Sequence, residues 1–143
     1  MISRIGTYWR NAEELPFLLR LLCKGGMVAG PILFVFLVVP IMDWTVNGHQ
    51  MSYSDLWRSG AGMSALLLIC LVTFGTWGMA ARLGWSRWAL VLAPVLSIIL
   101  FPKSLVPNLG FALINGLVTA VIIYGCLFHL KPVQVYFSKS DNA

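Results

Sequence analysis

The amino-acid sequence predicts an all-α membrane protein, a bundle of four transmembrane helices whose N-terminus and C-terminus both lie in the cytoplasm. Of the 143 residues, 59% are apolar and 10% are charged, whereas about 25% of residues are charged in an ordinary globular protein. Four long stretches are almost free of charge, and the remaining charges are unevenly distributed between the loops. Ten basic and five acidic side chains cannot coat a soluble domain of this size, so a soluble fold is excluded.

The segment at 11–24 precedes the first apolar stretch and predicts an amphipathic helix at the inner membrane interface. Asn11 and Glu14 have the spacing of a capping box, and Arg20 and Lys24 share one helix face. The flexible pair at 25–26 would then lead the chain into the bilayer. The alternative is that the first span begins already near Leu15, with Arg20 extending its charge to the interface.

The predicted spans cover about residues 25–42, 60–81, 83–101 and 107–130, and only Arg87 interrupts the third. At about 1.5 Å per residue, helices of these lengths match a hydrocarbon core about 30 Å thick. Between the first two spans lies an outer loop at 43–59, and a cytoplasmic tail follows at 131–143. The whole chain therefore reads as a single integral membrane domain.

Positive charges set the predicted orientation. The net charge of +5 would point to nucleic acid on a soluble protein, but in a membrane protein it mainly reports topology, so no nucleic-acid partner is expected. If the N-terminus is cytoplasmic, only two of the ten basic residues, Arg58 and Lys103, lie outside. The other eight basic residues lie on the cytoplasmic side: Arg4, Arg10, Arg20, Lys24, Arg82, Arg87, Lys131 and Lys139. This positive-inside bias indicates a multi-pass membrane protein with both termini in the cytoplasm.

Small residues recur four apart on two spans, a spacing that allows close helix packing in lipid. Gly26 and Gly30 predict a packing face on the first span. Asn115, whose amide cannot be satisfied within its own helix, should reach a neighbouring helix, either to hold the bundle together or to make a functional contact. The spacing does not decide whether the neighbouring helix belongs to this chain or to a partner. The candidate partner-binding residues are Ala112, Asn115, Gly116, Thr119 and Ala120.

The outer loop supplies a second candidate contact surface, which consists of Trp44, His49, Tyr53 and Trp57. Its Asp43, His49 and Asp55 could be drawn as a metal or acid/base set, but their spacing matches no ligand motif. Catalysis within the bilayer needs ionisable residues, and the spans lack them at depth. The three cysteines are far apart and lie in or beside apolar stretches, so we read them as buried apolar side chains. We therefore expect no enzyme, no metal and no cofactor.

Two cytoplasmic segments carry a family resemblance. The hairpin at 82–89 (RLGWSRWA) and the ending at 127–137 (LFHLKPVQVYF) resemble those of small four-span bacterial inner-membrane proteins. Some proteins of this size and topology are immunity proteins that block a pore-forming colicin or a membrane-depolarising type VI secretion effector. The resemblance implies a four-helix membrane fold and assigns no role to any residue.

These observations predict a protein that acts by binding another membrane-inserted protein within the lipid bilayer. In the most concrete version, it is an immunity protein whose last span holds a toxin helix in a non-conducting arrangement. One alternative is a small oligomeric transporter or channel subunit for a neutral solute, which would use Thr73, Ser97 and Asn115 and a kink at Pro94. Another is an accessory subunit of a larger membrane complex. A homo-oligomer is compatible with each version.

Overall fold

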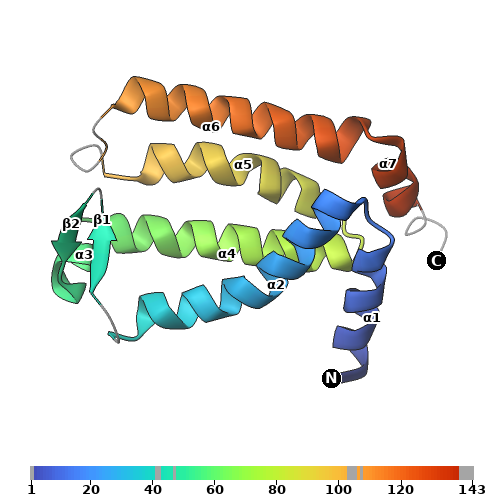
Figure 1. Ribbon diagram of the computed structural model, residues 1–143, viewed down its shortest axis with the longest axis horizontal. Coiled ribbons are helices and arrows are strands. Elements are labelled where there is room, and N and C mark those ends of the chain that lie inside the picture. Colours follow the sequence, from blue (N-terminus) through green and yellow to red (C-terminus); the bar gives the residue numbers. More distant parts are fainter. Residues whose placement is uncertain (1, 41–42, 47, 103–105, 107, 139–143) are drawn as a thin grey trace.

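The structure is a computed structural model that describes residues 2–40, 43–46, 48–102, 106 and 108–138. Apart from one small hairpin, its regular elements are helices, so the all-α class is confirmed (Figure 1). Their bounds are α1 Ile2–Glu13, α2 Phe17–Val38, β1 Trp44–Val46, β2 His49–Met51, α3 Tyr53–Arg58, α4 Ala61–Ala80, α5 Trp85–Leu100, α6 Leu109–Tyr124, η2 Gly125–His129 and α7 Lys131–Ser138. The element η2 is a π-turn that continues α6.

Among the described residues, three helices are long and apolar enough to cross a membrane: Phe17–Val38, Ala61–Ala80 and Leu109–His129. They correspond to the first, second and fourth predicted spans. The third predicted span is represented by α5, an apolar helix of 16 residues. At about 1.5 Å per residue, α5 is about 24 Å long, somewhat short of a hydrocarbon core of about 30 Å.

The N-terminal part of the chain differs from the predicted interfacial helix at 11–24. The helix break falls at Glu14–Pro16, and α2 runs without interruption through Gly25 and Gly26. Proline has no backbone N–H, and it disfavours the helical conformation in the residue before it, so the chain leaves the helix at Leu15. The structure thus has the alternative arrangement, in which a long first helix begins just after Leu15. Asn11 lies inside α1 and does not cap a helix.

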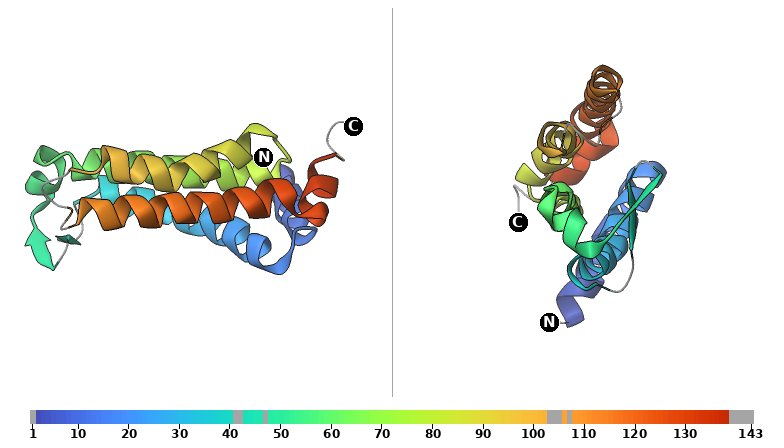
Figure 2. Two further views of the ribbon diagram at one scale, coloured as in Figure 1. Left: turned by 90° about the horizontal axis from the view of Figure 1, so that it is seen from above. Right: turned by 90° about the vertical axis from the view of Figure 1, so that its left-hand side faces the viewer.

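The four long helices form a bent row in the order α2, α4, α5, α6. Neighbours in this row pack against each other, whereas α2 and α6 form its two ends (Figures 1 and 2). The central helix α4 packs against α2 on one side and against α5 on the other. The arrangement is therefore an open layer of helices, and the end helices α2 and α6 keep long apolar faces exposed.

Small residues bring α4 close to both neighbours. On the α2 side, a Cβ added at Gly26 or Gly30 would collide with the side chain of Thr76 or Thr73, respectively. On the α5 side, a Cβ added at Gly78 would lie only 2.7 Å from the Cβ of Ser86. Van der Waals packing of this kind replaces the hydrophobic driving force that lipid removes.

The end of the molecule that carries β1, β2 and α3 is closed by local hydrogen bonds. The strands pair antiparallel, with Trp44 opposite Met51, and Gly48 at their connection has a φ of 81°, which favours glycine. Ser52 caps α3 by accepting a hydrogen bond from the Asp55 amide. The hydroxyl of Ser64 donates to the Leu100 carbonyl at 2.6 Å and joins α4 to the end of α5. We call this the hairpin end.

At the opposite end of the molecule, the short helices α1 and α7 pack against the long helices (Figure 1). We call this the α1/α7 end. The amide of Asn11 donates to the Ala80 carbonyl at 3.0 Å, and the hydroxyl of Tyr136 donates to the Met79 carbonyl at 2.9 Å. Both bonds reach carbonyls of the last turn of α4, where the regular helical donors run out; the Met79 carbonyl also accepts from the Arg82 backbone N–H at 2.9 Å. A cluster of buried apolar residues from α1, α2, α4, η2 and α7 fills this end.

Two glycine substitutions in α2 test the close packing of the row. Gly30→Ala places a Cβ on Thr73, so we expect it to lower the free energy of unfolding by about 1–3 kcal/mol. Gly25→Ala is the matched control, because an added Cβ there meets nothing within 4 Å, and helix propensity should raise stability by up to about 1 kcal/mol. Denaturant titration of the purified protein in detergent micelles measures both. Equal effects would contradict the packing.

Candidate functional site

A cavity of about 460 Å³ lies on one side of the helix row, between its two end helices. We call it the lateral groove. All four long helices contribute to its wall, and Figure 2 shows α2 and α6 at the opposite ends of the row. Six residues define its sides: Leu18 and Leu22 of α2, Ala93 and Ser97 of α5, and Ile122 and Cys126 of α6 and η2. The wall is almost entirely apolar, so the groove is suited to hydrocarbon.

The groove exists because α5 carries small side chains where its neighbours carry large ones. Ala93, Pro94 and Ser97 form the floor of the groove on α5, whereas leucine and isoleucine side chains project from α2 and α6. The hydroxyl of Ser97 donates to the Pro94 carbonyl at 2.8 Å. It therefore satisfies a carbonyl of its own helix and leaves no strong polar group in the groove.

Arg87 lies on α5 at the end of the groove nearest to α7. It precedes Leu90, Pro94 and Ser97 by three, seven and ten residues, so these four residues share one helix face. Its guanidinium carbon is 4.7 Å from the ring centre of Phe128 and 4.5 Å from that of Phe137. The neighbour of Phe128, Leu127, is itself part of the groove wall. Arg87 thus lies one helical turn before the groove residue Leu90, with two aromatic rings close to its guanidinium.

More aromatic side chains surround this cation. The ring centroids of Trp88 and Phe128 are 4.9 Å apart, and Tyr124 stacks on Phe128 at 4.8 Å. Tyr124 also meets the ring of His129 edge-on at 5.6 Å. Trp88 and Tyr124 remain exposed, as amphipathic aromatic residues do at a membrane interface.

Arg87 differs from the other cations of the α1/α7 end in its partners. Lys24 forms an ion pair with Glu13 at 2.9 Å, and Arg82 forms one with Glu14 at 2.7 Å. Of the residues that the structure describes, none forms a hydrogen bond or ion pair with Arg87, and its buried Nε has no acceptor. The Nε atoms of Arg20 and Arg82 also lack acceptors, but each of these two side chains makes a hydrogen bond through Nη2.

The α6 wall continues beyond the groove to Asn115 and Thr119, which lie on the same side of α6 as Ile122 and Cys126. Both residues are exposed. The Thr119 hydroxyl donates to the Asn115 carbonyl at 2.8 Å and is thereby satisfied. Throughout the described part of the chain, no group forms a hydrogen bond with the side-chain amide of Asn115.

The other predicted partner-binding residues face a different direction. An added Cβ at Gly116 would collide with the Ile98 side chain and would lie 3.2 Å from the Pro94 carbonyl oxygen. Ala120, one turn further along, is also buried, and Ala112 is half-buried. This small-residue face is therefore occupied by α5, and the five predicted residues do not form one surface.

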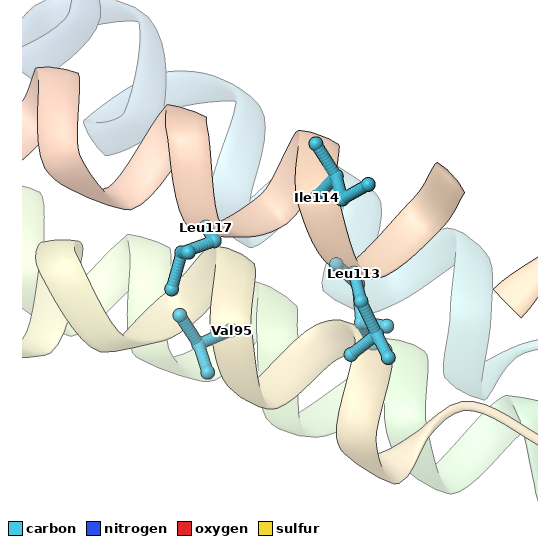
Figure 3. Close-up of a pocket in the computed structure, with 5 residues that line it drawn as sticks. Val95, Leu113, Ile114 and Leu117 are labelled. Atoms are coloured by element: carbon cyan, nitrogen blue, oxygen red, sulfur yellow. The ribbon is translucent and has the colours of Figure 1, made fainter. Parts of the chain in front are cut away.

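A second cavity, of about 220 Å³, lies between α5 and α6 near Val95 and Ile98 (Figure 3). Its wall on α6 consists of Leu113, Ile114 and Leu117. Asn115 points away from Leu113 and Leu117, because residues two apart on a helix are separated by about 200°. The cavity offers no polar group that could orient a ligand.

The outer-loop residues that the sequence singled out hold the hairpin end together. Trp44 and Trp57 pack beside the buried Leu37, Leu56 and Ala61. The Tyr53 hydroxyl donates to the Val38 carbonyl at 2.7 Å and fastens the loop to α2. The side chain of His49 lies outside the described part of the structure. These aromatics are thus engaged within the chain.

The described residues do not bring metal ligands or cysteines together into one site. No group of three His, Cys, Asp or Glu side chains comes together there. Cys23, Cys70 and Cys126 are free thiols, and they lie in separate places: Cys23 is buried against Thr76, and Cys126 lines the lateral groove.

The sequence reasoning missed the role of Arg87 and the existence of the groove. From the sequence alone, Arg87 is a charge on the cytoplasmic side that interrupts an apolar stretch. Its position three residues into α5, within an otherwise charge-free segment, was the available signal. The groove itself follows from the order of helices in the row, which no local pattern specifies.

Comparisons of the chain with family models, with curated proteins and with solved structures found no match.

Tyr136 provides a test of the α1/α7 end. Burial raises its pKa to about 12, against the opposing effect of Arg82. Because the folded state favours the neutral phenol, this contribution to stability is complete below pH about 10 and is lost as the pH rises to about 12. Tyr136→Phe should lower stability at neutral pH by about 1 kcal/mol, since the hydrogen bond from the Tyr136 hydroxyl to the Met79 carbonyl is lost, and should remove this alkaline loss.

Denaturant unfolding of wild type and Tyr136→Phe at a series of pH values measures both effects. An unchanged alkaline loss in the variant would contradict the assignment to Tyr136.

Proposed function

We propose that this protein crosses a bacterial inner membrane four times, with both ends in the cytoplasm. Three of the crossings are the helices long and apolar enough to span, and α5 is the fourth. The support is that α5 packs lengthwise between α4 and α6, and that α1 and α7 lie at the same end of the molecule (Figure 1). Chain ends on one side require an even number of crossings, and the positive-inside bias places that side in the cytoplasm.

Reporter fusions test this topology. Alkaline phosphatase is active only outside the cytoplasm, so we expect no activity when it follows Ser138 and strong activity when it is inserted at Gly48. Fluorescent protein fused after Ser138 is the matched control and should fluoresce. Active phosphatase after Ser138 would place that end of the chain outside the cytoplasm and overturn the proposal.

The function that we infer is recognition of another membrane-inserted protein through the exposed face of α6. A single observation carries this inference: the side-chain amide of Asn115 is exposed, and no group in the described part of the chain forms a hydrogen bond with it. Asn115 is the seventh residue of α6, about 9 Å from the start of a helix that spans the bilayer. An amide at that depth lacks water as a partner, so a neighbouring helix that supplies a donor and an acceptor is favoured.

The position of α6 at the end of the row makes it accessible to such a helix. Of the three long apolar helices, α6 with its π-turn is the least buried, and Ile114, Leu117 and Val121 are all more than 60% exposed. We propose a partner helix that places a hydrogen-bonding side chain opposite Asn115. The inward-facing Gly116 and Ala120 support this contact indirectly, by fixing α6 against α5.

Toxin immunity is the most concrete version of this function. A pore-forming toxin must insert helices into the same membrane, and capture of one of them by α6 would hold it in a non-conducting arrangement. No catalysis is required. The transporter alternative would need Thr73, Ser97 and Asn115 to line one path, but Thr73 lies between α2 and α4 and is not among the residues of the groove that Ser97 lines.

Asn115→Leu tests the recognition. Interhelical hydrogen bonds of this kind contribute about 0.6–2 kcal/mol, so we expect affinity for the partner to fall by about 3- to 30-fold. Val121→Leu, on another exposed face of α6, is the matched control and should have no effect. The readout is membrane potential in cells that produce the protein and are challenged with toxins that form pores in the inner membrane.

Unchanged depolarisation with the wild-type protein would refute the immunity version. Equal protection by wild type and Asn115→Leu would refute the Asn115 contact. A stable partner that co-purifies through Asn115 from unchallenged cells would instead identify an accessory subunit. Disulfide-linked dimers of an Asn115→Cys variant would identify a second copy of the chain.

A further inference from the structure

We propose that the lateral groove binds one anionic phospholipid, with the phosphate on Arg87 and one acyl chain along α5. The inference is independent of the partner proposed for α6, and only the assignment to the cytoplasmic leaflet depends on the proposed topology. Basic pockets between transmembrane helices on the cytoplasmic side are a recurrent form of anionic-lipid site. Three features of this molecule support the proposal.

The first feature is the state of Arg87. Its guanidinium lies 4.7 Å from the ring centre of Phe128 and 4.5 Å from that of Phe137, so two apolar rings cover part of the cation. Stacking of this kind leaves the N–H groups, which point outward in the guanidinium plane, free to donate. None of the described residues accepts from them, whereas Arg82 at the same end is paired with Glu14. A phosphate oxygen would satisfy these donors with charge-assisted hydrogen bonds.

The second feature is the length and lining of the groove. From Arg87 to Ser97 the α5 face extends over ten residues, or about 15 Å, which is the depth of one leaflet of a core about 30 Å thick. Along this path the side chains are apolar, apart from the Ser97 hydroxyl, which is bonded to its own helix. A phospholipid whose headgroup lies at Arg87 would therefore have its acyl chain alongside the groove, within the same leaflet.

The third feature is the size of the groove. The cavity of about 460 Å³ is lined almost entirely by apolar side chains from all four long helices. It therefore has room for a single extended acyl chain. Its opening between α2 and α6 gives such a chain lateral access from the bilayer.

Charge selects the headgroup. Arg87 lies at the same end as Arg82 and Lys24, and their two ion pairs leave Arg87 without a carboxylate. A zwitterionic headgroup would bring its own ammonium toward this positive region, whereas an anionic lipid brings net negative charge only. We therefore expect phosphatidylglycerol or cardiolipin to bind in preference to phosphatidylcholine.

Native mass spectrometry of the full chain, delipidated and then supplied with equal amounts of phosphatidylglycerol and phosphatidylcholine, tests the site. We expect one tightly retained phosphatidylglycerol. Arg87→Gln should lower its retention by about 10-fold or more, because hydrogen bonds to a charged group are lost. Arg58→Gln, at the hairpin end, should leave retention unchanged. Arg87→Lys should restore it only in part, because it keeps the charge without the planar fork.

A second pair of variants tests the acyl chain. Ser97→Leu adds volume inside the groove and should also lower retention, whereas Ile99→Phe adds volume on the opposite, exposed face of α5 and should not. Thermal unfolding of each variant in detergent shows whether it is folded, and Ser97→Leu keeps the test informative if Arg87→Gln does not fold.

Three results would overturn the proposal. Equal retention of phosphatidylglycerol and phosphatidylcholine would show a site without headgroup recognition. Loss with Arg87→Gln but not with Ser97→Leu would place the lipid outside the groove. Competition by soluble glycerol phosphate as strong as that of the whole lipid would identify a phosphate site without an acyl chain. Asn115→Leu should leave lipid retention unchanged, so the α6 proposal and this one can fail separately.

Discussion

The rest of the structure depends on how closely α4 approaches the two helices beside it. Gly26 and Gly30 meet Thr76 and Thr73 on one side, and Gly75 and Gly78 meet α5 on the other. In lipid, apolar surface gains nothing by leaving one hydrocarbon environment for another, so dispersion contacts at short range must supply the attraction. With both faces of α4 occupied in this way, α2 and α5 are held apart. The row, and with it the groove between its end helices, follows from that separation.

The two ends of the row are secured by different means. The hairpin end relies on local hydrogen bonds and half-buried tryptophans. The α1/α7 end relies on long-range bonds from Asn11 and Tyr136 to the last carbonyls of α4 and on two ion pairs. Segments from the beginning and the end of the sequence therefore stabilise the same helix terminus. This shared terminus fixes α7, and α7 in turn supplies the Phe137 ring that covers Arg87.

Composition and helix length predicted the fold class, because hydropathy over some twenty residues is a local property. The beginning of the first long helix was predicted less well: Gly25 and Gly26 look like a hinge, but in a helix packed against α4 they are accommodated, and Pro16 makes the break. The sequence predicts that Asn115 cannot satisfy its side-chain amide within its own helix. The direction of that side chain relative to Gly116 depends on which helix packs against α6, and a local pattern does not specify this. The pairing of Arg87 with rings some forty and fifty residues away could not be read from any local pattern.

The π-turn at Gly125–His129 has a consequence for how this chain tolerates change in length. A π-turn holds one residue more per turn than an α-helix. Deleting a single residue there would restore α-helical phase and rotate everything that follows by about 100°. Phe128 and Phe137 lie on or beyond this point and Arg87 lies before it, so the register between them is set by one surplus residue. The segment can therefore vary in side chains far more freely than in residue number.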